Sequence, residues 1–245
     1  MSRFCSIIRI HNTAGQFPVA VHSTAMPINF FSFPSEIRNK IYEEALVLSE
    51  PIVLVVTEPN GTLKGLSLPR NSSLCGPLRL CLAILFANNR AHREASPLLY
   101  SRNRFRLQNP TLFLDDIGPQ NASFLRHICI AFPAIYDYHH LESVTLKEDS
   151  IRTLERIRDN CTNLATLETS LRFRTIIAME SAIDIDSPRP LALVDARFKA
   201  ISSLKEIIVN VYDEPISCDL REEMRGCGWT IEGTWEESES VGSYG

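Results

Sequence analysis

Three stretches in the C-terminal half of the chain share one apolar pattern, which limits the fold more than any other feature of the sequence. They read LRHICIAF at 125–132, LATLETSL at 164–171 and LKEIIVNV at 204–211. Each has a leucine, an isoleucine or leucine three positions later, and two further alternate positions that are apolar except at Thr169. Alternation over such short runs is typical of β-strands.

Helical patterns separate these strands, at residues 148–161 and 190–202, and a last helix-strand pair is expected in CDLREEMRGCGWTIEGTW. Parallel strands need a long crossover, and these connections are long enough for a helix. We therefore predict an α/β fold, in which the region from about 120 to 236 forms one sheet with helices on one side. The repeats are spaced by 39 and 40 residues, longer than the usual 20 to 29 of leucine-rich repeats. An irregular leucine-rich-repeat-like region over 119–236 is thus expected.

The N-terminal half opens with an amphipathic helix predicted over residues 34–48. Pro34 suits its first position, where a missing N–H costs nothing. An apolar stripe repeats at helical spacing on one side, and charged or polar residues cover the other. The stripe consists of Ile37, Ile41, Ala45 and Leu48, and the polar side of Arg38, Asn39, Lys40, Glu43 and Glu44. Amphipathic helices usually bury such a stripe in their own core, here on the apolar helix that follows.

A short β-hairpin is predicted next, with strands at 51–58 and 62–68 joined by the turn sequence PNG. The region 78–101 is mostly apolar and helical, and Pro97 is expected at a kink or break. A short strand is predicted within NRFRLQ at 103–108. A further helix should begin after Asn109 as N-cap and end before Gly118.

Two of these segments resemble a known family. FPSEIRNKIYEEAL is similar to the first helix of F-box and F-box-like domains, through Phe33, Pro34, Glu36, Ile37 and Ile41. NNRAHREASPLLYSRNRF, at 88–105, resembles the second signature of fungal F-box-like proteins. The matching residues there are Glu94, Ala95, Leu98, Leu99, Tyr100, Asn103 and Phe105.

The resemblance implies an F-box-like segment over residues 30–118 and a non-enzymatic role in protein–protein interaction. F-box domains dock onto the small adaptor subunit of cullin-RING ubiquitin ligases, so it implies a substrate-receptor-type subunit. The residues expected to bind the partner are Phe33, Pro34, Ile37 and Ile41. Two alternatives stay open, namely a scaffold that buries this helix and binds no adaptor, and an enzyme with a dispersed active site.

Charge and motif content narrow the function further. The net charge is −4, which argues against a nucleic-acid binder even though Arg90, Arg93, Arg102, Arg104 and Arg106 cluster locally. The sequence YDYHHLE at 136–142 is expected to be a solvated loop and not a metal site. Motifs of nucleophilic, phosphate-binding or zinc-dependent enzymes do not occur, so no catalytic residue, cofactor or metal is predicted.

Seven cysteines are scattered without paired spacing, which favours a reducing, intracellular compartment such as cytoplasm or nucleus. No apolar run is long enough for a membrane span. Residues 1–29 are expected to be a disordered leader, with a mitochondrial presequence as the alternative. The acidic end 237–245 is expected to be a disordered tail.

Overall fold

The computed structural model describes residues 29–56, 63–67, 81–135, 145–172, 175–177, 179, 190–212 and 216–233. The chain divides into two compact units, Met1–Arg126 and His127–Gly245, each of which is considered by itself below. The predicted leader, apart from Asn29, and the predicted tail lie outside the described residues, as do the hairpin turn and the YDYHHLE segment.

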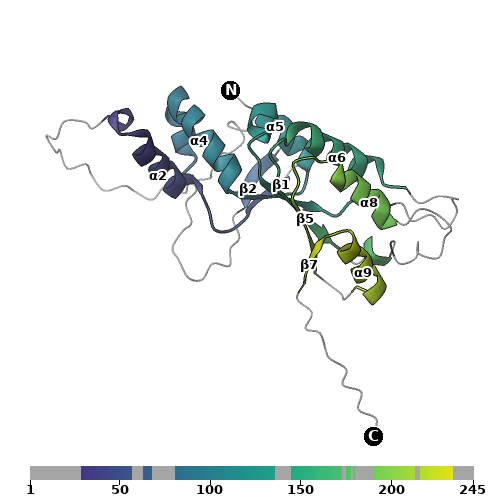
Figure 1. Ribbon diagram of the computed structural model, residues 1–245. Coiled ribbons are helices and arrows are strands. Elements are labelled where there is room, and N and C mark those ends of the chain that lie inside the picture. The colour runs from purple at the N-terminus through teal and green to yellow at the C-terminus, as the bar shows by residue number, and fades with distance from the viewer. Residues whose placement is uncertain are drawn as a thin grey trace, which may run out of the picture. The chain divides into compact units, whose positions relative to one another are not determined.

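The first unit combines helices with three neighbouring strands (Figure 1). Its elements are η1 (Phe30–Ser32), α2 (Ser35–Leu46), β1 (Ile52–Val56), β2 (Leu63–Ser67), α3 (Ala83–Ala87), α4 (Asn89–Arg102), β3 (Arg104–Leu107) and α5 (Pro110–Ala122). Strand β1 pairs antiparallel with β2 and parallel with β3. The antiparallel pair confirms the predicted hairpin, and α2 and α4 lie side by side.

Two helix boundaries in this unit differ from the prediction. Pro34 is the N-cap of α2 and not its first helical residue, because its ψ of 150° is extended. The break in the 78–101 region falls at Asn88, with φ −171° and ψ 172°, whereas Pro97 lies inside α4. The break falls at Asn88 because its side chain accepts hydrogen bonds from the backbone N–H groups of Arg90 and Ala91 and so caps a new helix.

Helix α5 begins as the sequence predicts. The Asn109 side chain accepts from the backbone N–H of Leu112 at 3.1 Å and so caps the helix. Gly118, at φ 77° and ψ 165°, interrupts the helical backbone, and a further turn follows it to Ala122. The glycine thus ends the first helical segment as predicted, since almost only glycine adopts this conformation.

The second unit contains a parallel sheet whose strands follow the chain order β4-β5-β6-β7. Its elements are β4 (His127–Ala131), α6 (Glu148–Asn160), β5 (Thr166–Leu171), α8 (Pro190–Lys199), β6 (Glu206–Val211), α9 (Cys218–Gly226) and β7 (Thr230–Gly233). The three repeat strands therefore lie in one sheet, as predicted, and the α/β class is confirmed.

Strand register follows the repeat pattern residue by residue. Ile128 lies opposite Leu167, which lies opposite Ile207, and two residues later Ile130, Thr169 and Val209 form the next row. Thr169 is fully buried, and its hydroxyl donates to the backbone carbonyl of Ile208 at 3.3 Å. This hydrogen bond explains why one polar residue is tolerated in an otherwise apolar row.

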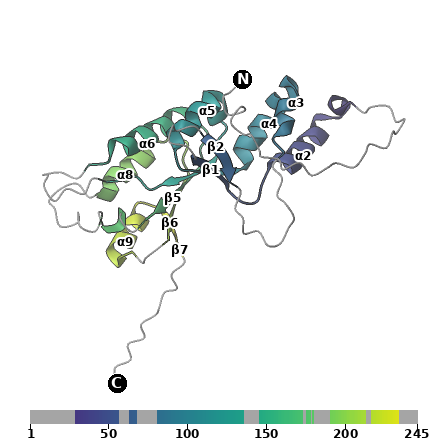
Figure 2. The same ribbon diagram turned by 180° about the vertical axis from the view of Figure 1, so that it is seen from behind.

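Helices α6 and α8 lie side by side in both views of the ribbon (Figures 1 and 2). A surface ion pair between Arg197 and Glu155, at 3.3 Å, joins them. The rings of Phe132, of Phe198 on α8 and of Trp229 form a cluster with centroid distances of 5.4 to 6.3 Å. This aromatic cluster belongs to the core that the helices cover.

Candidate functional site

An apolar stripe on the outer side of α2 is exposed. It consists of Phe33, Pro34, Ile37 and Ile41, and we call it the α2 stripe. The exposed fractions are 36% for Phe33, 49% for Ile37 and 39% for Ile41, and Pro34 is exposed as well. Phe33, Ile37 and Ile41 follow one another at i, i+4 spacing, and Pro34 adjoins Phe33. The four residues that the sequence predicts for partner binding therefore lie on a side of α2 that the described part of the first unit leaves open.

Helix α2 packs on α4 through a different face from the one its hydrophobicity indicates. Tyr42 and Leu46 are fully buried, and Arg38 is only 7% exposed. The sequence assigned Arg38 to the solvated side, which is wrong. The reason lies far along the chain, because its charge is matched by Glu94 on α4.

Glu94 is the centre of this contact. Arg38 donates to it twice, from Nε to Oε2 and from Nη2 to Oε1, both at 2.8 Å. The Arg90 guanidinium donates to Oε1 at 2.9 Å, and the Tyr42 hydroxyl donates to Oε2 at 3.2 Å. These bonds, that from Arg38 first, lower the pKa of Glu94 to about 2. Burial, together with the neighbouring Glu94 carboxylate, raises the pKa of Tyr42.

The turn before α2 is tied to the same network. Arg38 Nη1 donates to the backbone carbonyl of Phe33. In η1, the Phe30 ring meets that of Tyr42 edge-on at 5.5 Å, and the guanidinium of Arg90 lies 5.0 Å from the centroid of the Phe31 ring. Phe33 is thus anchored through its backbone while its side chain stays exposed.

Asn103 joins the two helices at their C-terminal ends. Its Nδ2 donates to the carbonyls of Leu46 and Leu99, both at 2.8 Å, and its Oδ1 accepts from the N–H of Leu48 at 2.8 Å. The side chain is buried, so three backbone groups depend on it. Asn103, one of the residues that carry the resemblance in the sequence, therefore joins α2 and α4 structurally.

The apolar residues around Asn103 form the adjacent core. Leu99, Tyr100 and Phe105 are buried, the rings of Tyr100 and Phe105 stack at 5.9 Å, and Phe105 meets Phe113 at 5.5 Å. The apolar run of Leu98, Leu99, Tyr100 and Phe105 in the sequence predicts a clamp on the N-terminal helix near Ile41. The predicted position of the clamp is wrong, because Ile41 is exposed. The contact with α2 is made instead at Leu46, through the side chain of Asn103.

Three arginines of the local basic cluster have separate partners. Arg90 binds Glu94, Arg102 lies 3.9 Å from Glu43, and Arg104 donates to the carbonyl of Ser49 at 3.2 Å. Their charges are distributed around the ends of α4 and are in part neutralised. This arrangement is that of a solvated helix end.

The second unit contains a polar ladder that the sequence analysis missed. His127 Nε2 lies 3.0 Å from Glu168 Oε2, and Asn210 Nδ2 donates to Glu168 Oε1 at 2.7 Å. These residues lie on β4, β5 and β6, at positions that alternate with the apolar rows of the repeat. They are diagonal neighbours, because Glu168 lies opposite Cys129 and Ile208, so an alignment of the repeats shows only that they share a face of the sheet. A carboxylate that orients an imidazole is also a part of many hydrolase sites, so this pair is where a dispersed active site would be sought.

Among the described cysteines, Cys161 is buried and free, and burial raises its pKa to about 12. Within the described ranges, no group of three or more metal-ligating side chains comes together. The described helices are all too short or too polar to cross a membrane.

Comparison of the chain with protein-family models, with curated proteins and with solved structures finds no match.

Proposed function

We propose that this chain is a non-enzymatic protein-interaction module of F-box-like type, and that the α2 stripe is its docking surface. The partner is the small adaptor subunit of a cullin-RING ubiquitin ligase, which makes the chain a substrate-receptor-type subunit. One observation carries the proposal: the predicted partner-binding residues are exposed on a helix whose opposite face is held by buried polar contacts.

The physical basis of docking is a helix face that enters a groove. Ile37 and Ile41 lie one helical turn apart, which is the spacing of helix-in-groove anchors. Large apolar side chains left in water gain free energy when a partner covers them. Because Arg38 and Glu94 already fix the orientation of α2, less conformational freedom is lost on binding.

The second unit would supply the substrate-capturing part. Its in-register parallel strands support a leucine-rich-repeat-like role, in which successive strands present side chains along one surface. The scattered spacing of the seven cysteines supports a reducing, intracellular location, in the cytoplasm or nucleus.

Size-exclusion chromatography of the full chain mixed with the purified adaptor tests this proposal. We expect co-elution with the wild type and loss of co-elution with Ile37→Glu. A matched control is Asn39→Glu, which introduces the same side chain at an exposed position on another side of α2. If the wild type and the adaptor elute separately, the alternative of an adaptor-independent scaffold becomes the better account.

A further inference from the structure

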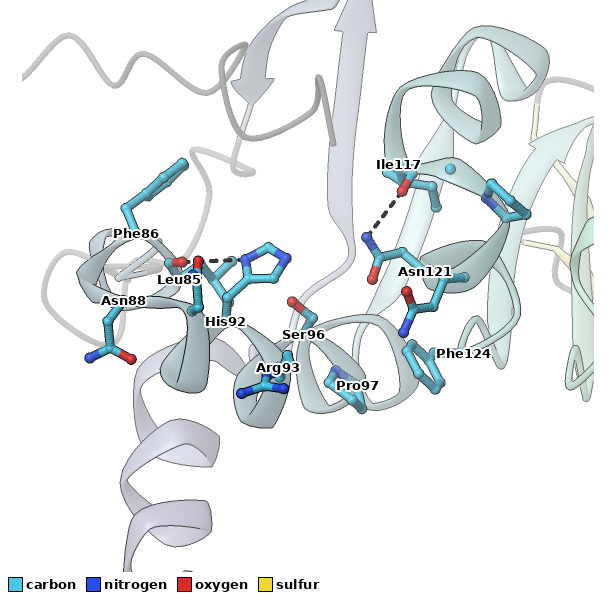
Figure 3. A pocket seen from close by; sticks show the side chains of 14 residues that line it. Leu85, Phe86, Asn88, His92, Arg93, Ser96, Pro97, Ile117, Asn121 and Phe124 are labelled. Atoms are coloured by element: carbon cyan, nitrogen blue, oxygen red, sulfur yellow. Dashed lines mark hydrogen bonds between the residues drawn. The ribbon is translucent and has the colours of Figure 1, made fainter. Parts of the chain in front are cut away.

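A cavity in the first unit has no part in the proposed docking surface. It has a volume of about 850 Å³ and lies between α4, the end of α3 and the last turn of α5 (Figure 3). This volume is within the range of small-ligand sites, roughly 300 to 1,000 Å³. Helix α4 lines it with residues at helical spacing, namely Asn89, His92, Arg93, Ser96 and Pro97.

Ser96 gives the clearest sign that the cavity is built for a ligand. The residue is only 4% exposed, and among the described residues its hydroxyl has no hydrogen-bond partner. Figure 3 shows this oxygen directed into the space between α4 and α5. Buried hydroxyl groups are almost always hydrogen-bonded, so a ligand atom in the cavity would satisfy it.

His92 presents an acceptor to the same space. Its Nδ1 lies 3.3 Å from the backbone carbonyl of Leu85. A carbonyl can only accept, so Nδ1 carries the proton and Nε2 of the neutral ring is left as an acceptor. The ring extends from α4 toward Ile117 on the opposite side of the cavity (Figure 3). A ligand N–H or O–H is the natural partner for Nε2.

The charge of the lining selects an anion. Arg93 is exposed and lines the cavity, and no aspartate or glutamate occurs among the lining residues that the structure describes. A guanidinium binds a carboxylate through two parallel N–H···O bonds. The cavity therefore offers one strong site for a carboxylate group.

Apolar groups complete the lining. Phe86 is 45% exposed, and Phe124, Pro97 and Ile117 line the cavity with it. The break of α5 at Gly118 sets its last turn off from the preceding helix, and this turn lines the opposite wall. In that turn, Asn121 Nδ2 donates to the Ile117 carbonyl at 3.0 Å, which fixes the amide.

We propose that this cavity binds a carboxylate that carries a neighbouring amide N–H and an apolar side chain, as in an N-acylated apolar amino acid. The carboxylate pairs with Arg93, the amide N–H donates to His92 Nε2, and the amide carbonyl accepts from the Ser96 hydroxyl. The apolar side chain lies against Phe124 and Pro97, which Figure 3 shows next to each other. The same chemistry occurs in a free N-acyl amino acid and in the C-terminal residue of a peptide.

Isothermal titration calorimetry on the full chain tests the proposal with matched probes. They are N-acetyl-phenylalanine, its primary amide, N-acetyl-glycine and a short peptide with a C-terminal phenylalanine. We expect the acid to bind at least about tenfold more tightly than the amide, because the charge-assisted pair is lost. N-acetyl-glycine should bind more weakly than N-acetyl-phenylalanine, because it has no ring to bury.

Two arginine variants separate the cavity from a general charge effect. Arg93→Gln should remove the preference for the acid over the amide, whereas Arg102→Gln, at the other end of α4, should keep it. Ser96→Ala should lower the affinity for every probe that binds the wild type. The peptide distinguishes the sources, since tight binding of the peptide indicates a chain end and exclusion of the peptide indicates a free small molecule.

Three results would overturn the assignment. One is equal binding of acid and amide. Another is an acid preference that survives Arg93→Gln. The third is no heat of binding with any probe up to about 10 mM, where a site with a Kd near 1 mM would be mostly occupied. Circular dichroism of each variant checks that the fold is retained.

Discussion

Arg38 and Glu94, 56 residues apart in the chain, meet in a two-pronged ion pair with both N···O distances at 2.8 Å. This contact decides which face of α2 is buried. The arginine side turns inward together with Tyr42, and the isoleucine side is left in solvent. A helix that would bury its isoleucines by hydrophobicity alone thus displays them instead.

The ion pair predicts a pH-dependent part of the stability. The pKa of Glu94 falls from 4.5 to about 2 on folding. A carboxylate with a lowered folded pKa stabilises the protein above its unfolded pKa, and this stabilisation is lost as the pH falls through the folded value. We therefore expect the wild type to be more stable than Glu94→Gln at neutral pH. The gap should narrow between pH 4.5 and about pH 2.

Thermal unfolding at stepped pH measures that gap. Glu36→Gln, at an exposed position in the first turn of the same helix, is the control and should differ little from the wild type. A gap for Glu94→Gln that stays constant as the pH falls would contradict the ion-pair account.

Replacing Asn103 with alanine should destabilise the first unit. The change leaves two carbonyls and one N–H without their partner, and each buried group left unpaired costs about 1–3 kcal/mol. Denaturant unfolding measures the loss. For comparison, Asn109→Ala removes an exposed helix cap and should cost about 1 kcal/mol. An equal loss of stability for both variants would mean that the hydrogen bonds of Asn103 between α2 and α4 contribute no more than an exposed helix cap.

Leu99→Ala should cost about 2–5 kcal/mol, as truncations of buried leucines do, because Leu99 is only 1% exposed. Ile37→Ala should change the free energy of unfolding by no more than about 0.5 kcal/mol, since it is an exposed substitution. Chemical denaturation of the two variants checks both values. A large cost at Ile37 would show that the α2 stripe is part of the core and not a free surface.

Gly118→Ala should cost about 1–3 kcal/mol, because φ 77° with ψ 165° is strained for any residue with a Cβ. The strain acts although no atom of the described residues lies within 4 Å of the position of a Cβ. Gly226→Ala, in α9, is the matched control, because that glycine has no positive φ and equally open surroundings. It should be neutral or stabilising by about 0.5–1 kcal/mol. Equal melting temperatures for both variants would contradict the backbone argument.

Local patterns predicted the second unit well. The rows of Ile128, Leu167 and Ile207 align in the sheet because a strand's side chains alternate, so a shared pattern fixes the register. The predicted helices 148–161 and 190–202 correspond to α6 and α8. Here apolar periodicity and burial agree.

Local patterns did not predict the burial of residues whose interaction partner lies far away in the sequence. Nothing near Arg38 in the sequence shows that Glu94 will neutralise it, so its burial could not be read from the helix alone. The break at Asn88 had a local signal, an asparagine in N-cap position, but Pro97 was the stronger breaker by propensity. The cavity could not be foreseen either, because its walls come from helices separated along the chain.

The central claim is that the exposed side of α2 docks onto the adaptor subunit of a cullin-RING ligase. Isothermal titration of the purified adaptor into the wild type, Ile37→Glu and Asn39→Glu tests it most directly. The account predicts saturable binding by the wild type and by Asn39→Glu, and a loss of at least about tenfold in affinity with Ile37→Glu, since a charge would replace a buried anchor. Equal affinity of all three proteins, or no binding by the wild type, would contradict it.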